Sequence, residues 1–495
     1  MPESLTSIGN LEDFSSDTQN DNDILSFEVP SKIETSETQK LPRISKINLN
    51  AESSCRGTVE NKQELGTRQL EQFRYFHSNI KSRSFMRENA DALESAEYHT
   101  YMYALGLENI NANVFSREAG ELGDKIKEKN VYVLLHGWTG NESIYSSVKQ
   151  ENQLTIAEEI MAKDPNAVVI TMDGNGFGET NFREDVLQGD LQQYCTPEAY
   201  AAQVDFFVSH VLGFKDEDKD NVSIMGHSMG GAAAMILGAR YGYENTVALS
   251  PALFPSKENL LEIEETFEDA THASKMEDLL KRLGYRTSGD GRYAFVGTVA
   301  KVGAQTKKAL PQVTNKATEV FFNFVGPNYM GEEITGNLGT DKQLVSDLME
   351  IHRGEVDKHA LVDYALTNLR RGVDFSSWSL EEITRLNDSA VLTSEKDKLV
   401  TPKDVVNLLK TISSYELLLA SSKSPEDLNS NEINAIKAQV EAVNHGVESE
   451  TLQRIIVPGG HYATVYNEAG VDILVHGAAA KRALREAKKD RLENN

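Results

Sequence analysis

The stretch that most constrains this chain runs from Asn221 to Tyr241 and has the sequence NVSIMGHSMGGAAAMILGARY. It opens with the apolar run Val222–Met225, which predicts a buried parallel strand. Gly226–Gly230 then follows the G-x-S-x-G pattern, and the alanine-rich segment after it favours a helix. A strand, a sharp turn and a helix in this order hold a serine as a nucleophile, so Ser228 is the candidate.

The glycines of this turn have a steric reason. We expect Ser228 in a strained conformation, and a side chain at Gly226 or Gly230 would obstruct the close approach of strand and helix. The pentapeptide alone also occurs by chance in glycine-bearing loops. The assignment therefore depends on what the rest of the chain places beside Ser228.

Charge and composition narrow the functional classes. The chain has 76 acidic and 50 basic residues and a formal net charge of −26. This balance argues against a nucleic-acid partner and against electrostatic docking on anionic lipid. The two cysteines, Cys55 and Cys195, have no metal-ligand spacing and form no disulfide framework, which favours a reducing compartment. We expect no metal site and no cofactor.

The N-terminal sequence MPESLTSIGNLEDF lacks the basic and apolar regions of a signal peptide. No apolar run approaches the roughly 18 residues that a membrane span needs, so we expect no stable membrane insertion. A cytoplasmic protein is the expectation, with leaderless secretion left open.

The pattern along the chain predicts five regions. Residues 1–62 are polar and acidic and are predicted to form a disordered tail. Residues 63–97 have apolar residues at near-helical spacing and predict a helical extension. An α/β core is expected over 98–253 and 387–495, interrupted over 254–386 by a mainly helical cap insertion.

Strands alternate with helices in the core, which predicts a mostly parallel sheet with helices on both faces. Besides Val222–Met225, the expected strands are 98–106, 110–116, 130–135, 167–172, 246–249, 389–394 and 454–457. In such sheets a ligand binds outside the carboxyl ends of the strands. The loops HGWTG, DGNGFG and GHSMG each follow a strand, so we expect them to converge on one rim.

Three strand ends carry a serine, an aspartate and a histidine in the chain order Ser228, Asp397, His461. Together with HGWTG, DGNGFG, GHSMGG, SEKDKLVTP and PGGHY, this order resembles the α/β-hydrolase-fold serine hydrolases of the lipase, esterase and monoacylglycerol-lipase-like kind. The resemblance covers residues 131–253 and 387–490. It implies the α/β-hydrolase fold and a Ser-His-Asp catalytic triad.

The acid has alternatives nearby. Glu395 lies two residues before Asp397, and Asp388 lies just before the same strand. We prefer Asp397 because the acid should lie a few residues past the strand end. The 64 residues from Asp397 to His461 exceed what one helix and one strand require, which leaves the position of the acid open.

The resemblance also implies a site for the oxyanion of the tetrahedral intermediate. Its donors would be the backbone N–H of Met229 and that of Trp138, in the loop after His136-Gly137. Gly137 and His227 are grouped with them as oxyanion or substrate-binding residues.

The leading hypothesis is a serine hydrolase that cleaves a carboxylic ester, either a lipid or another acyl ester, through an acyl-enzyme. A large cap motivates the apolar substrate, because caps over this rim shape apolar pockets. A thioesterase, an amidase or peptidase, and an acyltransferase would use the same triad. A non-catalytic binding protein on this fold is the alternative from another class. The sequence leaves the oligomeric state open.

Overall fold

The computed structural model describes residues 74–79, 102–117, 123–149, 153–188, 191–254, 342–353, most of 372–412, 454–493 and Tyr364. Contacts divide the chain into the units Met1–Leu49 and Asn50–Asn495, and the described residues all lie in the second. The predicted tail over 1–62 is outside the described residues. So are most of the extension over 63–97 and most of the cap over 254–386.

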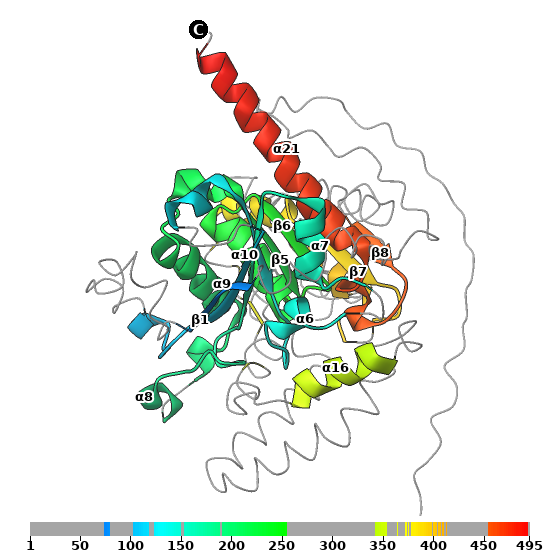
Figure 1. Ribbon diagram of the computed structural model, residues 1–495. Coiled ribbons are helices and arrows are strands. Elements are labelled where there is room, and N and C mark those ends of the chain that lie inside the picture. The colour runs from blue at the N-terminus through cyan, green and yellow to red at the C-terminus, as the bar shows by residue number, and fades with distance from the viewer. Residues whose placement is uncertain are drawn as a thin grey trace, which may run out of the picture. The chain divides into compact units, whose positions relative to one another are not determined.

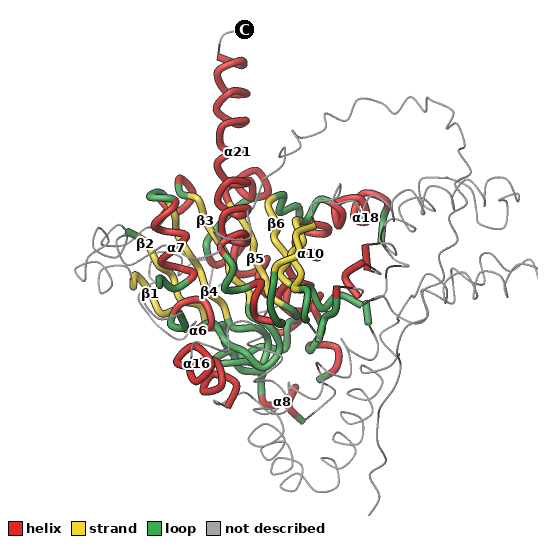
Figure 2. The backbone as a smooth tube through the Cα atoms, turned by 90° about the vertical axis from the view of Figure 1, so that its right-hand side faces the viewer, coloured by secondary structure: helices red, strands yellow, loops and turns green. Residues whose placement is uncertain are grey.

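An eight-stranded sheet organises the described part of the chain (Figures 1 and 2). Its strand order is β1-β2-β4-β3-β5-β6-β7-β8. β2 is antiparallel to both β1 and β4, and the remaining neighbours are parallel. The strands are β1 Arg74–Asn79, β2 Asn111–Ser116, β3 Asn130–Leu135, β4 Ala167–Met172, β5 Val222–His227, β6 Asn245–Leu249, β7 Ala390–Ser394 and β8 Arg454–Val457.

Helices cover both faces of the sheet. Figure 1 shows α9 and α10 on one side of the strands and α7 and α21 on the other. The helices are α6 Ser143–Ser146, α7 Ile156–Lys163, α8 Glu184–Leu187, α9 Pro197–Phe206, α10 Met229–Tyr241, α16 Lys342–Arg353, α18 Leu380–Asn387 and α21 Glu468–Glu493. Short 3-10 or π-helical turns are η1 Gly123–Glu128, η2 Gln192–Tyr194, η3 Phe207–Val211, η4 Asp216–Asn221 and η9 His461–Thr464.

Strand β3 shows how the sequence builds the two-sided core. Val131, Val133 and Leu135 belong to the apolar cluster beneath α9 and α10, whereas Tyr132 and Leu134 belong to the cluster on the opposite face. All five side chains are fully buried. Successive side chains of a strand point to opposite faces, so a continuous apolar run is required where both faces are covered.

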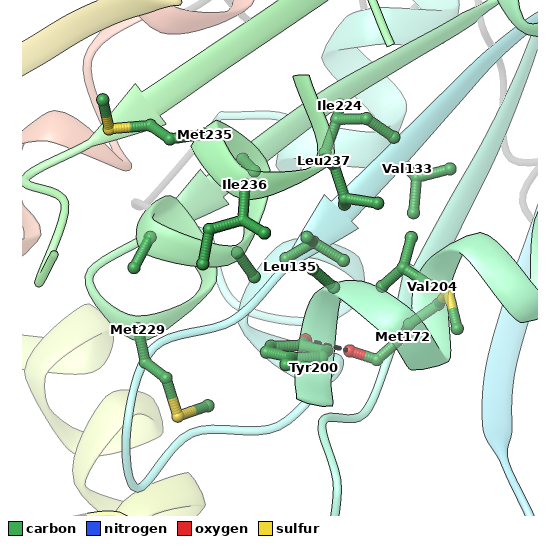
Figure 3. Close-up of a cluster of buried hydrophobic side chains, with 14 of the residues drawn as sticks. Val133, Leu135, Met172, Tyr200, Val204, Ile224, Met229, Met235, Ile236 and Leu237 are labelled. Atoms are coloured by element: carbon green, nitrogen blue, oxygen red, sulfur yellow. Dashed lines mark hydrogen bonds between the residues drawn. The ribbon is translucent and has the colours of Figure 1, made fainter. Parts of the chain in front are cut away.

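Figure 3 shows part of the cluster beneath α9 and α10. Val133 and Ile224 of the sheet lie beside Leu237 of α10, and Tyr200 of α9 donates its hydroxyl to the Met172 carbonyl at 3.2 Å. This bond satisfies the buried phenol at the carboxyl end of β4. The packing therefore fixes α9 and α10 against the strand ends that carry the HGWTG, DGNGFG and GHSMG loops.

The expected fold class is confirmed, and most predicted strands agree with the observed ones within two residues. The prediction of a strand over 98–106 is wrong where the structure describes that range, because residues 102–104 are helical. The helical prediction for 63–97 is wrong where the structure describes that range, because Arg74–Asn79 forms β1. Tyr75 and Phe76 favour strands, and pairing with β2 supplies partners for the backbone groups of that strand.

The described ends of the insertion lie at the core. The Val373 N–H donates to the Phe254 carbonyl at 2.7 Å, so the insertion leaves and re-enters the core at one place. Helix α18 then begins with a capping box between Ser379 and Glu382. Its Ile383 is buried in the same cluster as α10, so the core resumes before residue 387, earlier than the sequence predicts.

Candidate active site

Ser228 lies between β5 and α10 in a backbone conformation that non-glycine residues rarely adopt, with φ 54° and ψ −112°. Such a conformation costs about 1–3 kcal/mol and persists only where neighbouring groups enforce it. Here the Ser228 N–H donates to the Leu249 carbonyl at 2.8 Å, and the Ala252 N–H donates to the Ser228 carbonyl at 2.9 Å. The end of β6 therefore holds the predicted turn in place.

The predicted steric need for glycine in this turn is confirmed. A Cβ atom on Gly226 would overlap the Gly230 carbonyl group, and a Cβ atom on Gly230 would lie 2.6 Å from the His136 carbonyl oxygen. The first turn of α10 thus lies directly against the end of β3. This close approach of α10 to the end of β3 places the HGWTG loop beside Ser228.

Gly137 is the point at which that loop meets the turn. A Cβ atom on Gly137 would lie 3.1 Å from Ser228 Cβ and 2.9 Å from His227 Nδ1. Thr139, two residues later, has a φ of 69°, so the loop bends sharply after Trp138. The structure therefore places Gly137 and His227, two of the residues that the sequence grouped around the serine, beside Ser228.

His136, the first residue of this loop, is fully buried and fixes the loop through two hydrogen bonds. Its Nδ1 donates to the Gly137 carbonyl at 2.7 Å, and its Nε2 accepts from the Gly174 N–H at 2.8 Å. Because an acceptor at Nε2 requires the proton on Nδ1, the ring is the neutral Nδ1–H tautomer. His136 thus joins the HGWTG loop to the DGNGFG loop.

Asp397 and His461 form a buried pair at the ends of β7 and β8. His461 Nδ1 lies 2.7 Å from Asp397 Oδ2, and the two side chains are 5% and 0% exposed. Asp397 Oδ1 accepts the N–H groups of Leu399 and Val400 at 2.9 and 2.8 Å. Since a carboxylate accepts only, His461 carries its proton on Nδ1, and Nε2 is left as a base.

The two alternative acids are placed differently. Glu395 has a side chain that is 49% exposed, and Asp388 is also exposed. The long chain between the acid and the histidine does not separate them. Part of it returns to the core, where Leu408 and Ile412 are buried in the cluster beneath α10.

His227 is also buried, at 1% exposure. Its Nε2 lies 3.1 Å from the His461 carbonyl oxygen, and its ring centroid is 4.5 Å from the rings of His461 and Tyr462. The ring of His461 is therefore packed against the residue that precedes Ser228. The sequence grouped His227 with the oxyanion residues, and it could not predict this contact across 234 positions.

A residue of the rim that the sequence did not single out is Asp173, the first residue of the DGNGFG loop. Burial and the neighbouring Glu142 raise the pKa of its carboxyl to about 7, although N–H donors from Asn111, Glu179 and Glu142 favour the ionised form. The donor distances are 2.7, 2.9 and 2.8 Å. The sequence signal that could have identified Asp173 is an aspartate at a strand end followed by Gly-x-Gly.

Residues 124–319 match the model of a family described as "Putative esterase". Similar solved structures include an esterase from Exiguobacterium antarcticum, at 12% sequence identity and a TM-score of 0.32, covering 69% of this chain and 97% of that one. An enol-lactonase from Burkholderia xenovorans LB400 has 13% identity and a TM-score of 0.33, covering 62% and 85%. A hydrolase from Pseudomonas aeruginosa PA01 has 11% identity and a TM-score of 0.38, covering 75% and 95%. No curated protein matches the chain.

The sheet order, the antiparallel β2 and a serine turn after β5 define the α/β-hydrolase fold. With the family match over residues 124–319, the chain is an esterase-like α/β-hydrolase and a hydrolytic enzyme. Among the helices that the structure describes, none is both long and apolar enough to cross a bilayer.

Proposed function

We propose that this protein hydrolyses carboxylic esters of small molecules through a covalent acyl-enzyme on Ser228. The observation that carries the proposal is the buried hydrogen bond between His461 and Asp397, next to a serine held at positive φ at the end of β5. A serine hydroxyl is a weak nucleophile unless a base lies beside it, and an imidazole oriented by a carboxylate is such a base.

In the proposed reaction, Ser228 Oγ attacks the ester carbonyl carbon while its proton passes to His461 Nε2. The tetrahedral intermediate collapses, the bond to the alcohol oxygen breaks, and His461 returns the proton to the departing alcohol. Water then attacks the acyl-enzyme and gives its proton to His461. The carboxylic acid leaves as Ser228 regains a proton, while Asp397 stabilises each imidazolium.

The oxyanion would be bound by the backbone N–H groups of Met229 and Trp138. The closeness of Gly137 to Ser228 supports this role, because the HGWTG loop directly adjoins the nucleophile. The N-terminus of α10 adds a favourable dipole at the same point. Loss of one such donor raises the barrier by about 2.7–4 kcal/mol.

We further propose that the insertion selects the acyl part of the substrate and favours an acyl or lipid ester. Helix α16 of the insertion lies beside α6, which directly follows the HGWTG loop (Figure 1). Its Leu344 and Leu348 are buried in the same cluster as Ile144 and Tyr145 of α6. An amphipathic helix that packs its apolar face at this rim supports a role in recognising an apolar chain.

Covalent labelling tests the proposal. A fluorophosphonate probe should label the wild-type protein, with the modification mapped to Ser228, and Ser228→Ala should remain unlabelled. A panel of esters, thioesters and amides of graded chain length, with and without an alcohol acceptor, should show turnover of esters with water as the acceptor. Absence of labelling would point to a binding protein, and faster turnover of thioesters or amides, or transfer to the alcohol, would contradict the ester assignment.

A further inference from the structure

We infer that His227, the second residue of the GHSMG turn, is a positioning residue that aligns His461 with Ser228 through a hydrogen bond to the His461 backbone. This inference rests on the proposed function, because it concerns the same site. It differs from the role expected from the sequence, which grouped His227 with residues that contact the oxyanion or the substrate.

The hydrogen bond defines the state of the His227 ring. Nε2 lies 3.1 Å from the His461 carbonyl oxygen, and a carbonyl can only accept. Nε2 therefore carries a proton and donates it. In the neutral ring Nδ1 is then unprotonated, and it lies on the side of Gly137, where a Cβ atom would approach it to 2.9 Å.

Packing adds a second constraint on the same loop. The His227 ring lies 4.5 Å from the ring centroids of both His461 and Tyr462, at interplanar angles of 52° and 43°. Tyr462 is itself buried and stacks on Tyr466 at 6.5 Å and 27°. His461, the first residue of η9, is thus held against His227 at the end of β5, and Tyr462 is held between His227 and Tyr466.

The two constraints act on different parts of His461. Asp397 binds the ring at Nδ1, which fixes its tautomer and rotation. His227 binds the carbonyl, which fixes the backbone from which the ring projects. Since His227 adjoins Ser228 in the chain, any movement of β5 moves the nucleophile and the support of the base together. Near-attack geometry depends on such alignment, and a small misplacement is costly in rate.

The side chain also separates two loops that the reaction needs. The His227 imidazole lies 4.5 Å from the ring centroid of His461, and its Nδ1 lies beside Gly137, so one ring contacts both the loop after β8 and the turn at the end of β3. This explains why residue 137 has no room for a side chain. It also explains why a flat ring with a polar edge suits position 227.

Substitutions can separate the hydrogen bond from the packing. His227→Gln keeps an N–H donor at nearly the position of Nε2, and His227→Phe keeps a ring of similar size without a donor. Asn is shorter by one methylene group, so His227→Asn places its amide short of the His461 carbonyl. Gln and Asn are matched in chemistry and differ in reach, which keeps the test valid if the Phe variant does not fold.

Steady-state kinetics on an ester substrate should show the difference in kcat. We expect His227→Phe and His227→Asn to lower kcat about tenfold, equal to about 1.4 kcal/mol in the barrier, with KM within about twofold of wild type. His227→Gln should stay within about threefold in kcat, since it restores the bond. Proton NMR should show a downfield Nδ1–H resonance of His461 in wild type and Gln, and a broadened one in Phe and Asn.

The outcomes distinguish this inference from the proposed function. If wild-type protein hydrolyses esters and labels at Ser228, but Phe and Asn variants keep kcat within twofold, the positioning role is wrong. Equal losses in Gln and Asn variants would also overturn it, because reach would then not matter. If the wild-type protein neither labels nor hydrolyses esters, the proposed function itself fails.

Discussion

Three carboxylates lie on or next to β7, and burial separates them. Asp397 is fully buried in its side chain and accepts two backbone N–H groups besides the proton of His461. Glu395 and Asp388 are exposed. A solvated carboxylate interacts weakly with an imidazolium, whereas one in a low-dielectric site interacts strongly.

Asp397→Asn should lower kcat by about four orders of magnitude and leave KM nearly unchanged. An amide N–H in place of Oδ2 would face the Nδ1–H of His461, so the ring would adopt the other tautomer and present a proton to Ser228. Ester turnover and the rate of fluorophosphonate labelling measure the effect.

The matched controls for that variant are Glu395→Gln and Asp388→Asn. Both variants should keep turnover within about twofold, because both carboxylates are exposed and solvent screens their charges from the active site. A severe loss in Glu395→Gln together with a harmless Asp397→Asn would place the acid elsewhere on the same loop.

The individual site residues differ in how far the sequence could predict them. Ser228 and His461 could be predicted because each lies near glycines at the end of a predicted strand, and because their order along the chain is that of an α/β-hydrolase triad. The contact between His227 and His461 depends on how β5 and the loop after β8 pack, which no local pattern encodes. The same holds for Asp173, whose importance comes from its neighbours on β2 and after β3.

At the scale of elements, the loops after β3 and β4 are joined by the buried carboxylate of Asp173. It accepts the Glu142 N–H from the segment before α6 and the Asn111 side-chain amide from β2. Glu142 in turn accepts the Thr171 hydroxyl at 2.9 Å. The same segment follows the HGWTG loop, so this polar cluster fixes the rim next to Ser228.

The titration of Asp173 should make the free energy of unfolding depend on pH. Its pKa is raised from 3.8 to about 7, so between these values the folded state binds the proton and the unfolded state does not. Stability from this group is therefore complete below about pH 4 and falls as pH rises toward 7, by at most about 1.4 kcal/mol per pH unit. Urea unfolding of wild type and Asp173→Asn at pH 5 and pH 8 should show the stability advantage of wild type shrinking at pH 8.

Glu142→Gln is the control for this prediction. It removes the neighbouring charge and lowers the pKa of Asp173, so stability should vary less between pH 5 and pH 8 than in wild type. An advantage of wild type over Asp173→Asn that is constant, or that grows with pH, would contradict the assignment.

The elements themselves were predictable where burial on both faces produces apolar runs. Strands β3, β4 and β5 follow directly from such runs. In α9, Thr196 caps the helix and Pro197 is its first residue, as is typical of helix starts. β1 was not predictable in this way. It is an edge strand whose pairing with β2 is a long-range contact, and the spacing of its apolar neighbours also suits a helix.

For the whole molecule, the N-terminal region and the catalytic unit should be separable. Residues 1–62 have a polar composition, and contacts assign Met1–Leu49 to a unit apart from Asn50–Asn495. Deleting residues 1–49 should shift the melting temperature by less than about 2 °C and leave ester turnover unchanged. Calorimetry and kinetics on the truncated chain measure this, and a large drop in either would show that the region packs on the enzyme.

The insertion should likewise be separable from the chemistry, because its ends meet. Phe254 and Val373 are buried and joined backbone to backbone at 2.7 Å, so a turn of about four residues can replace residues 255–372. The cut spares α18, whose Ile383 belongs to the core. It removes Tyr364, which packs on Phe177 of the DGNGFG loop at a ring distance of 5.0 Å.

The shortened enzyme should still react with a small fluorophosphonate at Ser228 and hydrolyse short-chain esters. The GHSMG turn and the hydrogen-bonded pair of His461 and Asp397 both lie outside the insertion. It should lose its preference among acyl chain lengths and be less stable, since each large buried side chain removed contributes about 1.5–3 kcal/mol. Tyr364→Ala, with Tyr364→Phe as its control, offers a milder loss of the same contact if the shortened chain aggregates through newly exposed apolar surface. Chain-length profiles and labelling rates for the three variants decide the question. A folded variant that keeps the wild-type chain-length profile would remove the insertion from substrate selection, and one that no longer labels would show that the insertion contributes to the reaction itself.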